Sequence, residues 1–390
     1  MNVIKPFLML EKSGEVDFRV NLEAYLGLEE LDWPEMVVFC RNTEPIFAPI
    51  LEAVIQRGIP YIYDLDDNLF EIPLDTDLGK YHRAPARLQL LTRYLSQASR
   101  VRVYSRPLAE RAKQINPATV QVDAAVDWSN IRSPRRSASG PLQIVYATSR
   151  EEDPLAQIFL PALTSLLAQF PGQVEMNFWG VLPPELANHP GVHHLRPVRN
   201  YDEFMQRFSA MGFDIGLAPM LDDEFHRSKT NNKFREYSAS QIAGIYSDVE
   251  IYSRCVRDGE TGLLVQNSSA AWLDALTRLV TNVDLRHKIS RQGLDYAREN
   301  FSQEALVRLW QSQMDEVLSG DKKDIAGNEA RLFVASEPVA LMSAGSWYRS
   351  KLKRMSGKIR EQTPASVWKK LTLTASNLWF LYRINVLKRL

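Results

Sequence analysis

The sequence predicts an α/β fold of two doubly wound, Rossmann-like domains that face a cleft, with a basic helical extension at the C-terminus. Short buried-strand patterns alternate with helical patterns along most of the chain, and this order indicates parallel sheets. A stretch rich in Ser, Pro, Arg and Gly at 132–141 divides the alternation into two series, as a linker does. The 390 residues suffice for two domains with cores and an appendage. We therefore expect domains at 1–135 and 136–320, and an extension at 321–390.

The first series begins after about 35 weakly patterned residues. Its apolar runs predict strands at 36–41, 60–64, 100–105 and 118–123. Its amphipathic stretches predict helices at 45–58, 87–99 and 107–115, the first closed by Gly58 and the last opened by Pro107.

The second series follows the linker and is longer. It predicts strands at 142–148, 174–180, 213–219, 244–247 and 261–267. It predicts helices at 153–170, 201–211, 232–241, 269–281, 283–300 and 302–317. In such sheets ligands bind at the carboxyl ends of the strands, and with two facing domains they bind in the cleft between them.

Composition restricts the compartment. The two cysteines, Cys40 and Cys255, are far apart in the chain, which fits a reducing compartment and argues against a disulfide framework or a zinc site. The first 18 residues lack the apolar core of a signal peptide, and no stretch reaches the roughly 18 apolar residues of a membrane span. We expect a cytoplasmic protein.

Charge is unevenly distributed although the whole chain is neutral. Residues 346–390 hold eleven Lys or Arg and one acid, interleaved with Trp, Tyr and Leu. This pattern favours a peripheral contact with the anionic inner face of the cytoplasmic membrane. The alternative is that these residues pack on the acidic body of the chain or on a partner subunit. We expect no nucleic-acid binding, because no stacking motif or known module is present.

Three carboxylates follow a buried strand in the segment PYIYDLDDNLFEIP, residues 60–73. Asp64, Asp66 and Asp67 repel one another unless water, a cation or backbone N–H groups offset their charge. The spacing is compatible with a metal-binding D-x-D, with the nucleophile of an aspartyl-phosphate phosphatase, or with a strand end whose acids line a cleft. The phosphatase ranks lowest, because Asn68 stands where that motif needs Thr or Val.

Ordered motifs in the second series resemble a known family. NKFREYSAS at 232–240 is followed by DGETGLLV at 258–265 and by N-x-x-x-x-W at 267–272. Over about 142–317 this resembles the nucleotide-sugar half of GT-B glycosyltransferases, closest to the large retaining group often called family 4. PYIYDLDDNLF resembles the acceptor-side domain of bacterial surface-polysaccharide members.

The resemblance implies a donor site in the second domain. Glu236 falls at the family's ribose-binding glutamate, and a carboxylate there can accept two hydroxyl hydrogen bonds. Lys229 and Lys233 lie near the start of the same helix, where two ammonium groups and the helix dipole suit a diphosphate. The remaining donor-site candidates are Arg150, Thr261 and Gly262. Each residue also has a plain structural explanation, such as a surface lysine, a first-turn acid or a turn glycine, so the prediction depends on their joint order.

The three aspartates are then expected on the acceptor side. In this architecture the donor groups lie elsewhere, so we expect no metal ion and no cofactor beyond the nucleotide-sugar co-substrate. Asp64 and Asp66 are candidate catalytic groups, and Asp67 is expected to orient the acceptor. His82 is a second candidate for handling a proton. An equally supported alternative is that the aspartates cap a helix or turn.

The function predicted is transfer of a sugar from a nucleotide-sugar to a glycan or polyprenyl-linked acceptor in bacterial surface-polysaccharide synthesis, metal-independent and with retention. Two departures from the family leave another function open: Ser228 replaces an acid eight positions before Glu236, and Gln241 and Ala243 replace Gly and Pro after the helix. The alternatives are an inactive binding or scaffold protein, or a sugar-nucleotide epimerase of the same fold.

Overall fold

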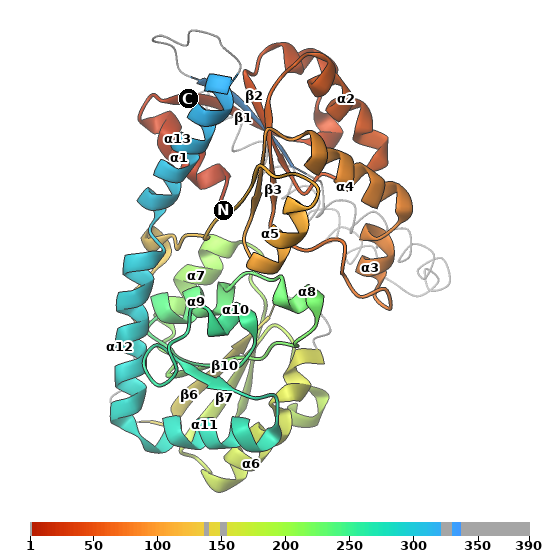
Figure 1. Cartoon of the computed structure of the whole chain (residues 1–390). Coiled ribbons are helices and arrows are strands. Elements are labelled where there is room, and N and C mark those ends of the chain that lie inside the picture. Colours follow the sequence, from red (N-terminus) through yellow and green to blue (C-terminus); the bar gives the residue numbers. More distant parts are fainter. Residues whose placement is uncertain (1, 136–139, 149–153, 321–329, 337–390) are drawn as a thin grey trace, which may run out of the picture. The chain divides into compact units, whose positions relative to one another are not determined.

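The computed structural model describes residues 2–135, 140–148, 154–320 and 330–336 (Figure 1). The described residues form two parallel sheets of six strands each, and both belong to one compact unit. The predicted α/β class with two Rossmann-like domains is therefore confirmed. We call the parts built around the two sheets the N-domain and the C-domain. The basic segment 346–390 lies outside the described residues.

The N-domain sheet has the strand order β1-β12-β2-β3-β4-β5. Its strands are β1 Val16–Leu22, β2 Met36–Cys40, β3 Tyr61–Leu65, β4 Arg100–Val103, β5 Thr119–Gln121 and β12 Ala330–Ser336. Four of them match predicted strands. Neither β1 nor β12 was predicted from the sequence.

The position of β12 differs from the domain boundaries expected from the sequence. This strand lies in a stretch expected to be an extension, yet it pairs in parallel with both β1 and β2, with Val16 opposite Ala330 and Leu332 opposite Met36. The preceding helix, α13 Gln303–Gly320, also packs on the N-domain. The N-domain is thus completed by residues from the far end of the chain.

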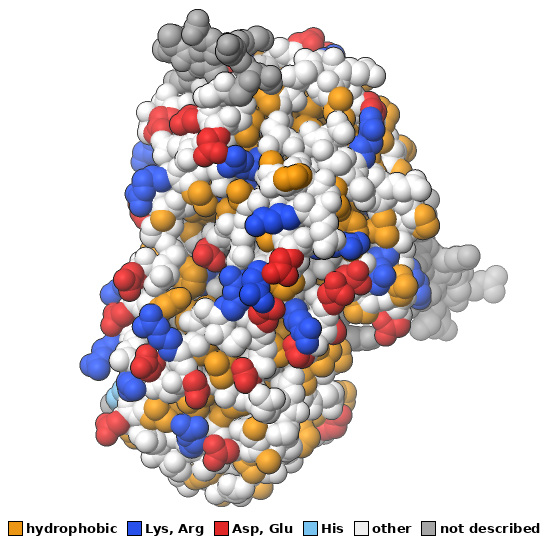
Figure 2. Space-filling model, viewed as in Figure 1, with side chains coloured by type: hydrophobic (Ala, Val, Ile, Leu, Met, Phe, Trp, Pro, Cys, Tyr) orange, Lys and Arg blue, Asp and Glu red, His pale blue; other side chains and the backbone are white. Residues whose placement is uncertain are grey.

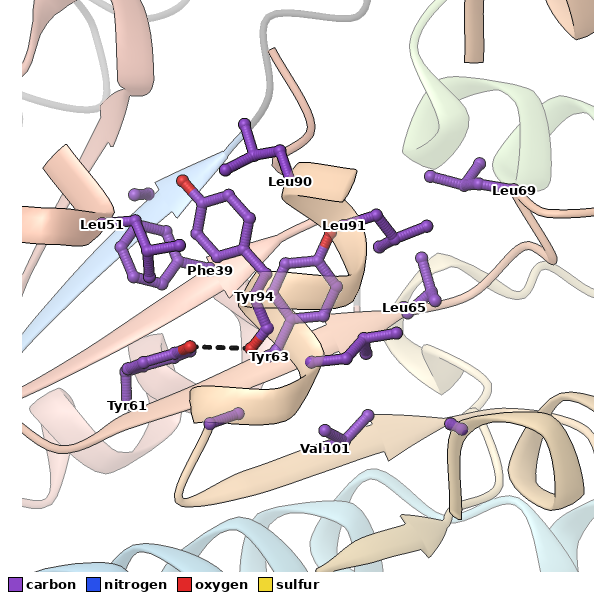
Figure 3. Packing of buried hydrophobic residues seen from close by; sticks show 14 of the residues in the cluster. Phe39, Leu51, Tyr61, Tyr63, Leu65, Leu69, Leu90, Leu91, Tyr94 and Val101 are labelled. Carbon is purple, nitrogen blue, oxygen red and sulfur yellow. Dashed lines mark hydrogen bonds between the residues drawn. The ribbon is translucent and has the colours of Figure 1, made fainter. Parts of the chain in front are cut away.

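Both faces of the N-domain sheet are buried, as a parallel sheet requires. On one face Phe39, Tyr61 and Tyr63 pack with Tyr94 and Leu91, and the Tyr61 hydroxyl donates to the carbonyl of Tyr94 at 2.7 Å (Figure 3). The helices of this face are α2 Ala48–Gln56, α4 Pro85–Gln97 and α5 Arg106–Lys113. A short helix, α3 Asp77–His82, precedes α4.

The opposite face is covered by α13 and by α1 Ile4–Lys12 (Figure 1). Trp310 of α13 is fully buried there, and its ring centroid lies 4.8 Å from that of Phe7. Its indole N–H donates to the carbonyl of Asn2 at 2.8 Å, which ties α13 to the start of the chain.

The C-domain sheet has the strand order β11-β10-β9-β6-β7-β8. Its strands are β6 Leu142–Ala147, β7 Val174–Trp179, β8 Val192–Leu195, β9 Ile215–Ala218, β10 Ala243–Ser247 and β11 Leu263–Val265. Five were predicted to within a few residues. The exception is the edge strand β8, because its exposed His193 and His194 interrupt any buried pattern.

Helices cover both faces of this sheet. One face buries α6 Leu160–Gln169 and α11 Ser269–Thr281. On the other face of the sheet, aromatic side chains from several helices pack into one cluster. These helices are α7 Tyr201–Ala210, α9 Asn232–Ala239, α10 Glu250–Ser253 and α12 Val283–Asn300, and α8 Glu224–Arg227 lies just before α9.

Candidate functional site

A cavity of about 490 Å³ lies at the carboxyl ends of the C-domain strands and reaches residues that follow β3 of the N-domain. Its volume is within the usual range for a small-molecule site. Of the predicted site residues it brings together five: Asp66, Asp67, Lys229, Lys233 and Glu236. These five come from two distant parts of the sequence.

The N-terminus of α9 forms the charged wall of the cavity. Asn231, its N-cap, makes no side-chain capping hydrogen bond, so the first backbone N–H groups of the helix are not capped in this way. Lys233 follows in the first turn, and Lys229 precedes the helix. An uncapped helix start with two ammonium groups provides positive charge of the kind that binds a phosphate or diphosphate.

Glu236 lies one turn further along α9 and is only 5% exposed. Its Oε2 accepts a hydrogen bond from Lys233 Nζ at 2.7 Å, and its Oε1 accepts one from the Tyr201 hydroxyl at 3.0 Å. Each carboxylate oxygen has a second acceptor position. The side chain is therefore held in one orientation and can still accept hydrogen bonds from a ligand's hydroxyl groups.

Asp66 and Asp67 are brought to the cavity by Arg41, which follows β2. Arg41 has φ 60°, a left-handed conformation that is strained for a residue with a side chain. Its guanidinium lies 3.1 Å from Asp66 Oδ1 (through Nε) and 2.7 Å from Asp67 Oδ2 (through Nη2). Asp67 Oδ1 also accepts from Lys229 Nζ of the C-domain at 2.7 Å.

These contacts give the two aspartates different acidities. Burial works to raise the pKa of Asp67, but Lys229 and Arg41 outweigh it and hold the pKa below its usual range. The pKa of Asp66 is raised, first by removal from water and then by the neighbouring Asp67, with Arg41 opposing. Asp66 is thus the better proton acceptor of the pair.

Asp64 does not line the cavity, in contrast to its expected place in the cleft. It is buried in the N-domain, where its Oδ2 accepts from the Tyr104 hydroxyl at 2.8 Å and from Arg102 Nε at 3.3 Å. Arg102 is fully buried over the ring of Trp310, 3.6 Å from its centroid. Strand alternation explains the difference, because Asp64 shares the α13 face of the sheet with Ile62. Burial raises its pKa to about 6.

His82 is likewise buried, at the end of α3, and does not line the cavity. Burial, with Arg41 and Arg87 nearby, lowers its pKa to about 4, so it is neutral at pH 7. Thr261 is buried and its hydroxyl accepts from the backbone N–H of Arg257 at 2.8 Å. Gly262 packs against Tyr246, where a Cβ atom would come within 2.7 Å of the ring. The structure places neither Thr261 nor Gly262 at the cavity, and Arg150 lies outside the described residues.

Ser228 is fully buried at the contact between the domains. Its hydroxyl accepts from Asn68 Nδ2 at 3.1 Å, and its carbonyl accepts from the Ser105 hydroxyl at 2.8 Å. No carboxylate therefore enters the cavity from this position of the described chain.

Several functional candidates were not predicted from the sequence. Arg41 and Tyr201 make the hydrogen bonds and ion pairs above, and four further aromatic side chains form part of the cavity lining, which we call the aromatic wall. This wall is formed by Tyr146, Trp179, Phe204 and Tyr252. Two of these aromatic residues could have been predicted from their position, because Tyr146 and Trp179 lie near the ends of predicted strands, where ligands bind.

A smaller pocket of about 170 Å³ shares Lys229 and Thr230 with the cavity. It includes Glu250 of α10, whose Oε1 lies 2.9 Å from Arg106 Nε of α5. Charged side chains of both signs gather on the surface over this part of the molecule (Figure 2).

In the part of the chain that the structure describes, no three His, Cys, Asp or Glu side chains are grouped to hold a metal ion. No helix among the described residues is long and apolar enough to cross a membrane.

Neither a protein-family model nor a curated protein matches the sequence. Solved structures do match. Sucrose-phosphate synthase from Thermosynechococcus elongatus is 14% identical, with a TM-score of 0.55 and 74% of each chain covered. Anabaena HepE in complex with UDP and glucose is 12% identical, with a TM-score of 0.55, and 72% of this chain covers 78% of that one. These neighbours are GT-B glycosyltransferases.

The chain has the GT-B fold. A third neighbour is a single-residue variant of S. aureus TarM, determined with Fondaparinux, alpha-GlcNAc-glycerol and UDP. It is 13% identical, with a TM-score of 0.55, and 73% of this chain covers 57% of that one. At these identities the likeness establishes the fold, and the expected GT-B architecture is confirmed.

Proposed function

We propose that this protein is a glycosyltransferase that moves a sugar from a nucleotide-sugar donor to a glycan or lipid-linked saccharide. One observation carries the proposal: the cavity places Glu236, Lys233 and Lys229 of the C-domain opposite Asp66 and Asp67 of the N-domain. A donor needs a cationic site for its diphosphate and an acceptor for its ribose hydroxyls, and the C-domain wall offers both. The GT-B neighbours with UDP in their titles support the same kind of donor.

The C-domain residues would act on the leaving group. Negative charge develops on the diphosphate as its bond to the anomeric carbon breaks, and Lys229, Lys233 and the start of α9 would stabilise it. This positive charge is why we propose a reaction without a bound metal ion. Glu236 would accept the ribose hydroxyls, and the aromatic wall would hold the base. Retention of configuration follows from the resemblance to the retaining family.

The N-domain residues would act on the acceptor. Asp66, whose pKa is raised, is the candidate to take the proton from the acceptor hydroxyl, and Asp67 would orient that hydroxyl. We propose structural roles for Asp64 and His82, because both are buried and neither lines the cavity. A bacterial surface-glycan acceptor and a position at the inner face of the cytoplasmic membrane are proposed from the sequence alone.

A second candidate is a binding or scaffold protein that holds a nucleotide or glycan without turnover. The burial of Ser228 favours it, since the family acid that commonly touches the donor sugar has no counterpart at this position. The two candidates differ in whether nucleoside diphosphate is released from a nucleotide-sugar.

The first test is thermal unfolding with UDP, GDP, dTDP and their sugars. A ligand that binds only the folded protein raises the melting temperature by mass action. We expect a shift with one base, and about 10- to 100-fold weaker binding in Glu236→Ala, because a charged hydrogen-bond acceptor is lost. Glu185→Ala removes an exposed glutamate outside the cavity and should behave as wild type. No shift with any nucleotide in folded protein would reject the donor site, and binding without release of nucleoside diphosphate would favour the scaffold.

A further inference from the structure

Lys229 is the one lysine of the described cavity wall that bonds to the opposite domain. Its Nζ donates to Asp67 Oδ1 at 2.7 Å and lies 4.0 Å from the ring centroid of Phe225. Lys233, by comparison, donates to Glu236 within its own helix. Two ligands thus compete for one ammonium group: the carboxylate already present, and the diphosphate of the proposed donor.

Asp67 does not depend on Lys229 alone. Its other oxygen, Oδ2, accepts from Arg41 Nη2 at 2.7 Å within the N-domain. The side chains of Lys229 and Asp67 are 18% and 23% exposed, so water screens their attraction only partly. If Lys229 were withdrawn, Asp67 would keep one cationic partner and would not be left as an unpaired buried charge.

We propose that the donor diphosphate displaces Asp67 from Lys229, and that this exchange releases one oxygen of Asp67 to bind the acceptor hydroxyl. The inference rests on the proposed function. A diphosphate carries more negative charge than a carboxylate and can also bind the uncapped start of α9, so it is the stronger ligand for Lys229. Donor binding therefore frees an oxygen of Asp67 on the acceptor side of the cavity, and the donor binds before the acceptor.

A residue that lines the cavity opposes donor binding, because the Lys229–Asp67 ion pair must break before the diphosphate gains Lys229. Replacing Asp67 should therefore strengthen the binding of a nucleoside diphosphate. It should leave a nucleoside without phosphates unaffected, since that ligand does not need Lys229.

The experiment is calorimetric titration of the full chain with UDP and with uridine, or with the matching pair for the base that the thermal panel identifies. We expect Asp67→Asn to lower the Kd for the diphosphate about two- to fivefold, the range of a partly screened ion pair. The Kd for the nucleoside should not change. Asp75→Asn removes an exposed carboxylate of the same N-domain loop and should change neither value.

A double-mutant cycle separates the ion pair from the general field of a negative charge. In a Lys229→Met background, Asp67→Asn should no longer strengthen diphosphate binding. If the gain persists there, or if Asp67→Asn binds the diphosphate no better than wild type, the inference is overturned. Circular dichroism and thermal unfolding check that each variant folds. If Asp67→Asn does not fold, the titrations are repeated with Asp67→Ser.

These outcomes are distinct from failure of the proposed function. If wild type binds no nucleoside diphosphate, both the donor site and the exchange are rejected. If wild type binds it and the Asp67 variants show no gain, only the exchange is rejected.

Discussion

The two sheets of the molecule are alike in strand number and direction but differ in where their strands come from. The C-domain sheet is built from one continuous stretch between β6 and β11. The N-domain sheet needs β1 from near the start of the chain and β12 from beyond the C-domain. The C-domain sheet is therefore local in sequence, whereas the N-domain sheet forms only when segments from the two ends of the described chain come together.

The sheets also differ in the charges they bring to the cavity. The C-domain supplies the lysines and Glu236 from one short helix and the turn before it, whereas the N-domain supplies two aspartates organised by Arg41. Under the proposed function, the groups that bind the donor diphosphate and ribose would come mainly from one segment of the C-domain. The groups that bind the acceptor would depend on the assembled N-domain sheet.

The largest expected effect tests that dependence. Trp310→Ala removes the fully buried ring that joins α13 to α1, and large-to-small changes of this kind cost about 3–5 kcal/mol of unfolding free energy. Urea unfolding measures the loss, and Trp310→Phe should lose less. Nucleoside diphosphate affinity should stay near wild type under folding conditions, because the donor groups lie in the C-domain. A loss below about 1 kcal/mol would show that the N-domain does not need α13.

The next effect is a dependence on pH carried by Asp64 and His82 of the N-domain. The pKa of Asp64 is raised to about 6, so between about pH 4 and 6 the folded protein holds a proton that the unfolded chain has lost. That group therefore stabilises the fold less as pH rises through this window. The pKa of His82 is lowered to about 4, so the unfolded chain takes up a proton below about pH 6.5 that the folded protein does not. That group stabilises the fold less as pH falls.

The two groups offset one another in the wild type, and single variants should separate them. Between pH 7 and 4.5, Asp64→Asn should lose more stability than wild type on acidification, and His82→Gln should lose less, by about 1–3 kcal/mol in each case. Urea unfolding at the two pH values gives the comparison. Equal pH dependence in all three proteins would contradict the assigned shifts.

A smaller effect concerns Tyr201 of the C-domain, which we assign as a positioning residue for Glu236. Tyr201→Phe removes the hydroxyl that donates to Glu236 Oε1, and we expect about three- to tenfold weaker binding of a nucleoside diphosphate. The matching 2′,3′-dideoxynucleoside diphosphate should bind both proteins equally, since it lacks the hydroxyls that Glu236 would accept. Equal weakening of both ligands would indicate a general packing defect.

The smallest effect lies at the end of α9. Gln241 has φ 58°, and the backbone N–H of Ile242 donates to the carbonyl of Tyr237 at 2.9 Å, so Gln241 occupies the position that usually holds glycine in this helix ending. Gln241→Gly should raise the unfolding free energy by about 0.5–1 kcal/mol. Gln241→Ala keeps the strained backbone and should show no gain in the same urea experiment.

The contrast between the sheets also explains how much the sequence could predict. Lys229, Lys233 and Glu236 lie within eight residues on one helix and its preceding turn, so the family resemblance of this segment predicted them together as one site. Asp66 and Asp67 were predicted from the end of a buried strand. Arg41 could not be, because nothing local connects it with residues about 25 positions away. Asp64 was misplaced because strand alternation was not applied to an aspartate flanked by apolar residues.

Two strands of the N-domain sheet, β1 and β12, were also missed. The alternating pattern of β1, VDFRVNL, is a local signal for a strand that the prediction overlooked. Its pairing with β12, roughly 300 positions further along, leaves no trace in a local window. The apolar run ARLFVAS at 330–336, which forms β12, was assigned to the basic extension 321–390 and was not predicted as a strand.

The insertion of β12 between β1 and β2 has a consequence for synthesis. When β5 has left the ribosome, the N-domain still lacks an interior strand, and about 200 residues must be made before β12 follows. At about 5–20 residues per second this takes roughly 10–40 s. During that time the edges of β1 and β2 have no partner between them, while the C-domain sheet can already close. The later-made C-domain sheet is therefore expected to finish folding first, and the emergence of β12 from the ribosome to be the step that completes the N-domain sheet.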